Sequence, residues 1–158
     1  MLKKGQQLPD EHHILRRVPW SRLLKDGDDN VIGFFPDAFK LRDGEPDLSV
    51  SWVEHHQGPT HEERVAQCIV ELRKANIRKT KKKLGTKTGF GIAVVGRVKE
   101  VCARAPKQIR IVYTPGDIGS HSSIENLPRD DERLREALAT EAFAERVMNV
   151  DIPGYDLP

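Results

Sequence analysis

Two serines and a histidine are the side chains of this sequence best suited to catalysis. Ser49 and Ser51 alternate with apolar residues, and because successive side chains of a strand point to opposite faces, we expect both hydroxyls on one face of a sheet. His121 lies in a polar stretch, residues 113–123, that follows an apolar run. A histidine flanked by hydroxyl groups can act as a general base or bind phosphate. The simpler interpretation is that the serines face solvent and that the polar stretch forms a turn.

The other histidines lack the spacing of a metal site. Four of them form the adjacent pairs His12–His13 and His55–His56, so a strand would offer only one imidazole of each pair to a given site. His61 is followed four residues later by Val65, where a zinc-protease helix carries its second histidine. We therefore expect no metal site.

Positive charge is concentrated in the middle of the chain. Residues 73–110 contain thirteen Lys and Arg residues and one acid, whereas the rest of the chain has thirteen basic residues and 23 acids. Such an asymmetric field attracts polyanions. The densest part is a basic connector, residues 78–87, with the cationic side chains Arg78, Lys79, Lys81, Lys82, Lys83 and Lys87.

The basic connector predicts a contact surface for phosphate groups or nucleic acid. Glycines at positions 85, 89 and 91 would let backbone N–H groups approach an anion, although the spacing is not that of a nucleotide-binding P-loop. Only Phe90 and Tyr113 offer aromatic rings nearby, so base stacking is weakly supported. The alternative is a solvated loop whose charges keep the protein soluble.

Periodicity predicts an α+β fold with a small mixed sheet and two main helices. Thr60 and Glu63 form a capping box before the first helix, over about residues 60–77, and the second covers about residues 130–147. We expect strands at residues 12–18, 31–35, 48–53, 90–95 and 108–114. Residues 38–41 are a short apolar run, and residues 98–105 are expected to form a shorter helix.

The length of 158 residues predicts a single domain, with irregular tails at residues 1–11 and 149–158. No apolar run is long enough to span a membrane, and no signal-peptide core follows the first residues, so we expect a cytoplasmic protein with no membrane partner. Cys68 and Cys102 lie on the apolar sides of their patterns and predict buried, reduced thiols.

The pattern Ser49-Val50-Ser51 resembles the Ser-x-Ser strand of ADP-ribosyltransferase-like folds. In that family the strand follows an earlier one bearing an Arg or His, for which Arg16, Arg17 or His13 are the candidates here. The resemblance implies binding of a nicotinamide dinucleotide and a later catalytic glutamate. Glu100 and Glu125 are the acids in the corresponding region.

A second resemblance is to a group of short bacterial proteins of no established activity. The segments that are similar are residues 16–20, 48–54 and 120–131. This resemblance implies a bacterial or phage source and no particular activity, and the residues themselves identify no cofactor.

Three functions follow from these patterns. The first is a phosphate- or nucleic-acid-binding protein that uses the basic connector. The second is a nucleotide-utilising enzyme in which His13, Arg16, Ser49, Ser51 and His121 line a pocket. The third is an accessory or immunity-type module whose acidic C-terminal third, residues 114–158, with ten acids and four basic residues, binds a protein partner.

Overall fold

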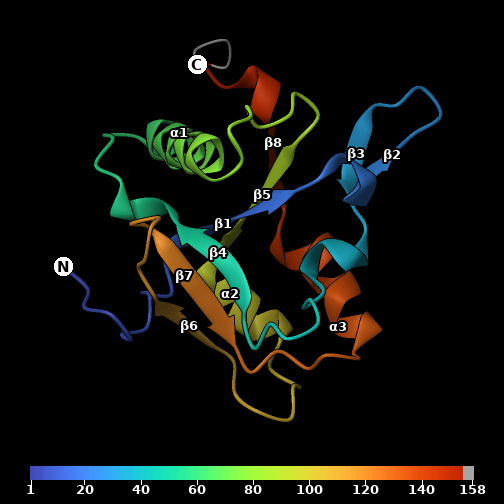
Figure 1. Ribbon diagram of the computed structural model, residues 1–158. Helices are drawn as coiled ribbons and strands as arrows, with labels where there is room; N and C mark the ends of the chain where they lie inside the picture. The colour runs from blue at the N-terminus through green and yellow to red at the C-terminus, as the bar shows by residue number, and fades with distance from the viewer. Residues whose placement is uncertain (155–158) are drawn as a thin grey trace.

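A computed structural model describes residues 1–154, and its centre is a six-stranded sheet in which every strand pair is antiparallel (Figure 1). The α+β class is confirmed, although the expected mixed sheet is antiparallel throughout. Across the sheet the strands are β6 (Arg110–Tyr113), β7 (His121–Glu125), β4 (Leu48–Trp52), β1 (His13–Val18), β5 (Gly89–Val94) and β8 (Glu145–Met148). A separate hairpin joins β2 (Leu23–Lys25) to β3 (Val31–Phe34).

Helix α1 (His61–Thr80) covers one face of the sheet. Thr60 caps the helix as expected, because its side chain accepts a hydrogen bond from the Glu63 N–H at 3.1 Å, which is one of the two bonds of a capping box. The helix ends where Lys81 adopts a left-handed conformation, φ 62°, and donates its N–H to the Ile77 carbonyl. Its apolar residues Val65, Cys68 and Ile69 pack on Leu15 of β1 and on Phe90 and Ile92 of β5.

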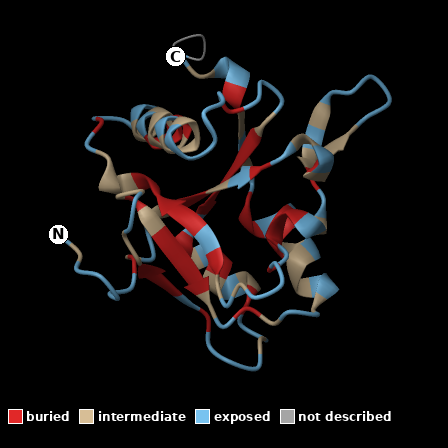
Figure 2. Cartoon of the chain, viewed as in Figure 1, coloured by how far each residue is buried: buried red, intermediate tan, exposed pale blue. Residues whose placement is uncertain are grey.

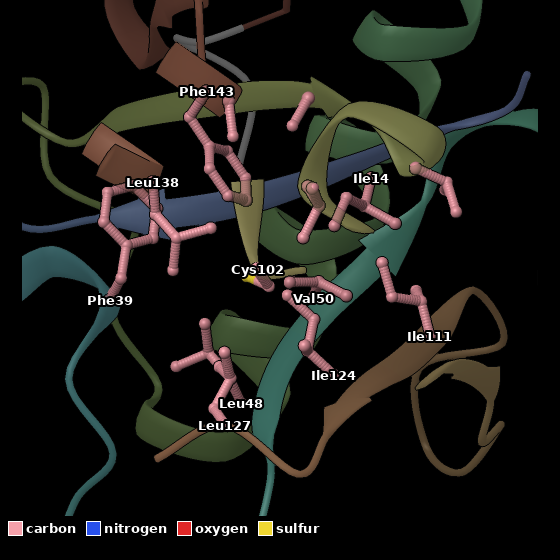
Figure 3. Packing of buried hydrophobic residues seen from close by; sticks show 14 of the residues in the cluster. Ile14, Phe39, Leu48, Val50, Cys102, Ile111, Ile124, Leu127, Leu138 and Phe143 are labelled. Carbon is pink, nitrogen blue, oxygen red and sulfur yellow. The ribbon is translucent and has the colours of Figure 1, made fainter. Parts of the chain in front are cut away.

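The opposite face carries the larger core. Short helices α2 (Val95–Val101) and α3 (Glu132–Ala137), a π-helical turn (Leu138–Ala142) and a 3-10 turn (Pro36–Phe39) cover it. Figure 3 shows Phe39 and Phe143 beside Leu138, with Ile14, Val50 and Ile124 of the sheet in the same core. The ring centroids of Phe39 and Phe143 are 4.5 Å apart. The sheet is therefore buried on both faces over most of its area.

Two elements differ from the sequence prediction. The second helix, expected over about residues 130–147, ends within the turn Leu138–Ala142, and residues 145–148 form edge strand β8 instead. Phe143 and Val147 have helical spacing, but they face different cores: Phe143 packs in the larger core and Val147 against the α1 side. The polar stretch 113–123 was expected to be a loop, yet its end begins strand β7, which pairs with β4 and β6.

Both ends of the described chain contact the body of the domain. Gln7 forms a β-bridge with Val112, and Leu8 is buried, so the N-terminal segment covers the edge of β6. Asn149 begins a 3-10 turn (Asn149–Asp151) and is fully buried. Among residues 1–154, no helix is long and apolar enough to cross a membrane.

Candidate functional site

The cationic side chains of the basic connector lie at the end of α1 and in the loop that joins it to β5. Arg78 and Lys79 occupy the last turn of α1, where positive charge also suits the helix dipole. All six cationic residues are exposed, and the loop is exposed over most of its length (Figure 2). Within the described residues, no acid forms a salt bridge with Arg78, Lys79, Lys81, Lys82 or Lys87.

A buried polar network anchors the connector from beneath. Arg73 belongs to the basic run in the sequence, but it is 9% exposed and its Nε donates to Asn149 Oδ1 at 2.8 Å. Its Nη2 donates to the Asn149 carbonyl at 2.7 Å. The Asn149 Nδ2 in turn donates to the carbonyls of Leu84 and Gly85, at 3.3 and 3.0 Å. Arg73 therefore holds the loop in place, while the lysines of that loop face solvent.

Asn76 links the connector to the sheet. Its Nδ2 donates to the Lys82 carbonyl at 2.9 Å, and its Oδ1 lies 3.4 Å from Nη1 of Arg17 on β1. Burial, and then the nearby Arg42, lower the pKa of Arg17 from its usual value. Because arginine starts from 12.5, its side chain stays charged at neutral pH and adds a cation beside the connector.

An aromatic ring from a distant segment also reaches the connector. Trp20 is half-exposed, and the Lys87 Nζ lies 4.9 Å from the centroid of its ring. The Lys25 Nζ lies 4.3 Å from the same ring and donates to the Trp20 carbonyl at 2.7 Å. Phe90 and Tyr113, the aromatic residues near the basic run in sequence, are buried in the cores. Sequence reasoning missed Trp20 because 67 positions separate it from Lys87.

Ser49 and His121 meet on the face of the sheet that α1 covers in part. The strand pairing places Ser49 opposite Ser123 and Ser51 opposite His121. The His121 Nδ1 lies 2.9 Å from the Thr114 carbonyl oxygen, which can only accept, and 2.9 Å from the Thr114 Oγ1, which can accept or donate, so a neutral ring protonated on Nδ1 satisfies both contacts. Nε2 is then an acceptor and lies 3.2 Å from the Ser49 Oγ. This geometry would let the imidazole accept a proton from the serine hydroxyl.

The other residues of the expected enzyme pocket point elsewhere. His13 is at the far end of β1, where its Nδ1 lies 2.5 Å from Glu54 Oε2. Arg16 faces the larger core, and its Nε and Nη1 donate to the carbonyls of Ala38 and Ser49. Burial lowers the pKa of Arg16 to about 10, with Glu45 opposing the effect. Ser51 is buried beside α1. The structure thus joins the Ser49 hydroxyl with His121, whereas Arg16 contacts only the Ser49 carbonyl and His13 pairs with Glu54.

Of the two glutamates considered, only Glu125 lies on the face of Ser49 and His121. Glu125 follows His121 by four residues in β7, and its carboxylate accepts from Arg110 at 2.9 Å. Glu100 lies on α2, which packs on the opposite face, and it pairs with Arg97 at 3.0 Å.

Histidines and glutamates gather around the first turns of α1 without forming a metal site. His56 Nε2 lies 3.4 Å from Glu71 Oε1, and His61 Nε2 lies 2.8 Å from Glu145 Oε1. Burial raises the pKa of Glu71, but hydrogen bonds from His56 and Ser120 outweigh it, so the pKa lies below its usual value. Burial, with His56 nearby, lowers the pKa of His55. No group of three potential ligands in residues 1–154 is arranged to hold a metal ion.

Both cysteines are free and buried. Burial, followed by the charge of Glu71, raises the pKa of the Cys68 thiol to about 12. Burial and Asp131 raise that of Cys102 to about 12. A thiol with such a pKa is protonated at neutral pH and is a poor nucleophile, so neither cysteine takes part in the candidate sites.

Comparison with protein-family models, curated proteins and solved structures found no match to the chain. The resemblances seen in short motifs therefore remain predictions, and function has to be argued from the geometry of the two candidate sites.

Proposed function

We propose that this protein binds nucleic acid through the phosphate backbone and that the basic connector is its contact surface. The observation that carries the proposal is a set of five exposed lysines and Arg78, at the end of α1 and on the anchored loop that follows it; five of these six residues have no salt-bridge partner within residues 1–154. Cations that no acid neutralises are available to phosphates, and their binding releases the counterions condensed on the polymer. Lys83 belongs to the same exposed surface.

The anchoring of the loop supports binding rather than a purely solubilising role. A loop that only kept the protein soluble would need no buried support, yet the Leu84 and Gly85 carbonyls are held by the fully buried Asn149, itself held by Arg73. Fixing the backbone beforehand lowers the entropic cost of ordering it on a ligand. Arg17, joined to the connector through Asn76, extends the positive surface onto the sheet.

Charge reversal tests this proposal. We expect Lys79→Glu/Lys81→Glu/Lys82→Glu to abolish retention of single- and double-stranded DNA and RNA at low salt, measured by fluorescence anisotropy of labelled oligonucleotides. The matched control is Arg104→Glu/Lys107→Glu/Arg133→Glu, which changes the net charge equally at exposed positions on the α2 and α3 side. The control should bind as the wild type does. Equal loss in both variants, or no binding by the wild-type protein at low salt, would refute the proposal.

The Ser49–His121 pair supports a second candidate function, a nucleotide-utilising enzyme. Its support is the 3.2 Å approach of Nε2 to the Ser49 Oγ, together with the carbonyl of Thr114 that fixes the ring. Here Glu125 takes the place of the glutamate that the ADP-ribosyltransferase resemblance implies, because it shares the strand of His121. His13 and Arg16 have no part in this version of the site.

A nucleotide-consumption assay tests the second candidate. Purified protein would be incubated with NAD and with nucleoside triphosphates, and products followed by chromatography. If the candidate is correct, Ser49→Ala and His121→Gln each lower turnover strongly, while Ser21→Ala, which changes an exposed serine away from the Ser49–His121 pair, leaves it unchanged. Turnover that survives both substitutions would remove this candidate.

A further inference from the structure

A groove next to the basic connector combines an aromatic ring with cations. It has a volume of about 760 Å³ and lies between the β2–β3 hairpin, the end of the connector and β8. Trp20 and Met148 supply apolar surface to its lining, and Lys87 and Arg146 supply positive charge. The groove thus lies within reach of any ligand that follows the connector.

The Trp20 ring is held in position but is not fully covered. It packs in part against the larger core and begins the 3-10 turn Trp20–Arg22 directly after Pro19. The Lys25 Nζ lies over the ring, 4.3 Å from its centroid, and is fixed there through its bond to the Trp20 carbonyl. Lys87 is exposed, and the ring is the only partner that the described residues give it. A ligand can therefore displace the Lys87 side chain from the ring and keep its ammonium group as a contact.

The chemistry of the groove favours an unpaired nucleobase. A base presents a flat π surface that stacks on an indole ring, and its phosphate lies a few bonds away, where a cation can reach it. Lys87 is such a cation, and so is Arg146, whose Nη2 is bound to the Val31 carbonyl at 3.1 Å. Asp29 and Asp151 also line the groove, and they repel phosphate from their side of it. The phosphates are thereby directed toward Lys87 and the connector.

We propose that the Trp20 groove receives an unpaired base of a nucleic acid whose phosphates lie on the basic connector, so that the preferred substrate is a single strand. This inference rests on the proposed function, because the connector supplies most of the attraction. Duplex bases are stacked on one another and do not expose their faces to a side chain. A duplex would therefore gain only the phosphate contacts.

Intrinsic fluorescence makes the inference directly testable, because the chain has only two tryptophans. Trp52 is 4% exposed in the larger core and donates its Nε1 to the half-buried His12, so we expect a ligand in the groove to affect Trp20. The probes are single-stranded oligothymidine, a DNA duplex of equal length and inorganic polyphosphate, which carries phosphate but no base. We expect oligothymidine to quench Trp20 and polyphosphate to bind without the same quenching.

Substitutions separate the groove from the connector. Trp20→Ala should weaken oligothymidine binding about tenfold, the usual size of one lost stacking contact, and leave polyphosphate binding unchanged. Trp20→Phe keeps a stacking ring and should retain most of the affinity, and it covers the case in which the alanine variant does not fold. Phe35→Ala, which removes an aromatic ring 43% exposed outside the groove, is the matched control and should bind as the wild type does.

The outcomes distinguish the two proposals. Equal binding of oligothymidine by the wild type and Trp20→Ala, or identical quenching by oligothymidine and polyphosphate, overturns the groove inference and leaves the connector proposal standing. Failure of every probe to bind overturns both. Preference for the single strand over the duplex that disappears in Trp20→Ala supports the inference.

Discussion

Replacing Asn149 with alanine should lower the free energy of unfolding more than replacing Asn76, the other asparagine that holds the connector. The side chain makes three hydrogen bonds at a fully buried position: it accepts from Arg73 Nε and donates to the carbonyls of Leu84 and Gly85. A typical hydrogen bond contributes about 1 kcal/mol, and groups left unpaired in the interior cost more. We therefore expect Asn149→Ala to lower the free energy of unfolding by about 3 kcal/mol.

Urea denaturation followed by circular dichroism measures this loss, and Asn76→Ala is the matched control. Asn76 also holds the connector, through Lys82 and Arg17, but it is half-exposed and lies within α1. Alanine is the better helix former, by about 0.5 kcal/mol, which offsets part of the lost bonds. The control should cost less than about 1 kcal/mol. If Asn149→Ala were as stable as Asn76→Ala, the connector would not depend on the buried network.

Three further predictions concern titration, thiol reactivity and packing. The pKa of His55 is lowered from 6.5, so the stability that its neutral form contributes is present above that pH and is lost as the pH falls below it. Urea denaturation from about pH 7.5 to 5 should therefore show the wild type losing stability relative to His55→Gln. The pKa of Glu71 is lowered from 4.5, so the wild type should lose further stability below pH 4.5, and Glu71→Gln should lack this loss. A thiol reagent should not modify Cys68 or Cys102 in the native protein at neutral pH and should modify both in urea; fast native labelling would contradict their burial. A β-carbon at Gly91 would lie 2.9 Å from the Phe34 ring, so Gly91→Ala should lower the melting temperature and cost about 1–3 kcal/mol, whereas Gly116→Ala, with open space around it, should change stability little.

Local sequence signals predicted the elements well where one signal dominated. Helix α1 has a capping box, an apolar stripe and a basic end, and it forms as expected. The strands β1, β4, β5 and β6 follow from short apolar or alternating runs. Strand β8 could not be recognised from the sequence, because Phe143 and Val147 have helical spacing although they pack in two separate cores. Strand β7 was not predicted, because its hydroxyl-rich sequence is also typical of a turn.

The sites depend on contacts that span long distances in the chain, which explains what sequence reasoning missed. The basic connector could be located from charge alone, but not its support by Arg73 and Asn149, which are 76 positions apart. The Ser49–His121 contact crosses 72 positions and requires that β4 and β7 be neighbours. The sequence indicated strands, but it did not indicate their order or register in the sheet. The order and register place Arg16 on the face opposite the Ser49 Oγ.

The salt dependence of binding tests the central claim most directly. For a single strand, the slope of log affinity against log salt concentration is about −0.7 for each phosphate contact, so four or five contacts from the connector predict a slope of about −3. Lys79→Glu/Lys81→Glu/Lys82→Glu should lose this dependence together with binding, and the Arg104→Glu/Lys107→Glu/Arg133→Glu control should keep it. A wild-type affinity that does not change with salt, or a slope that the connector variant shares with the wild type, would contradict the assignment of the basic connector as the nucleic-acid interface.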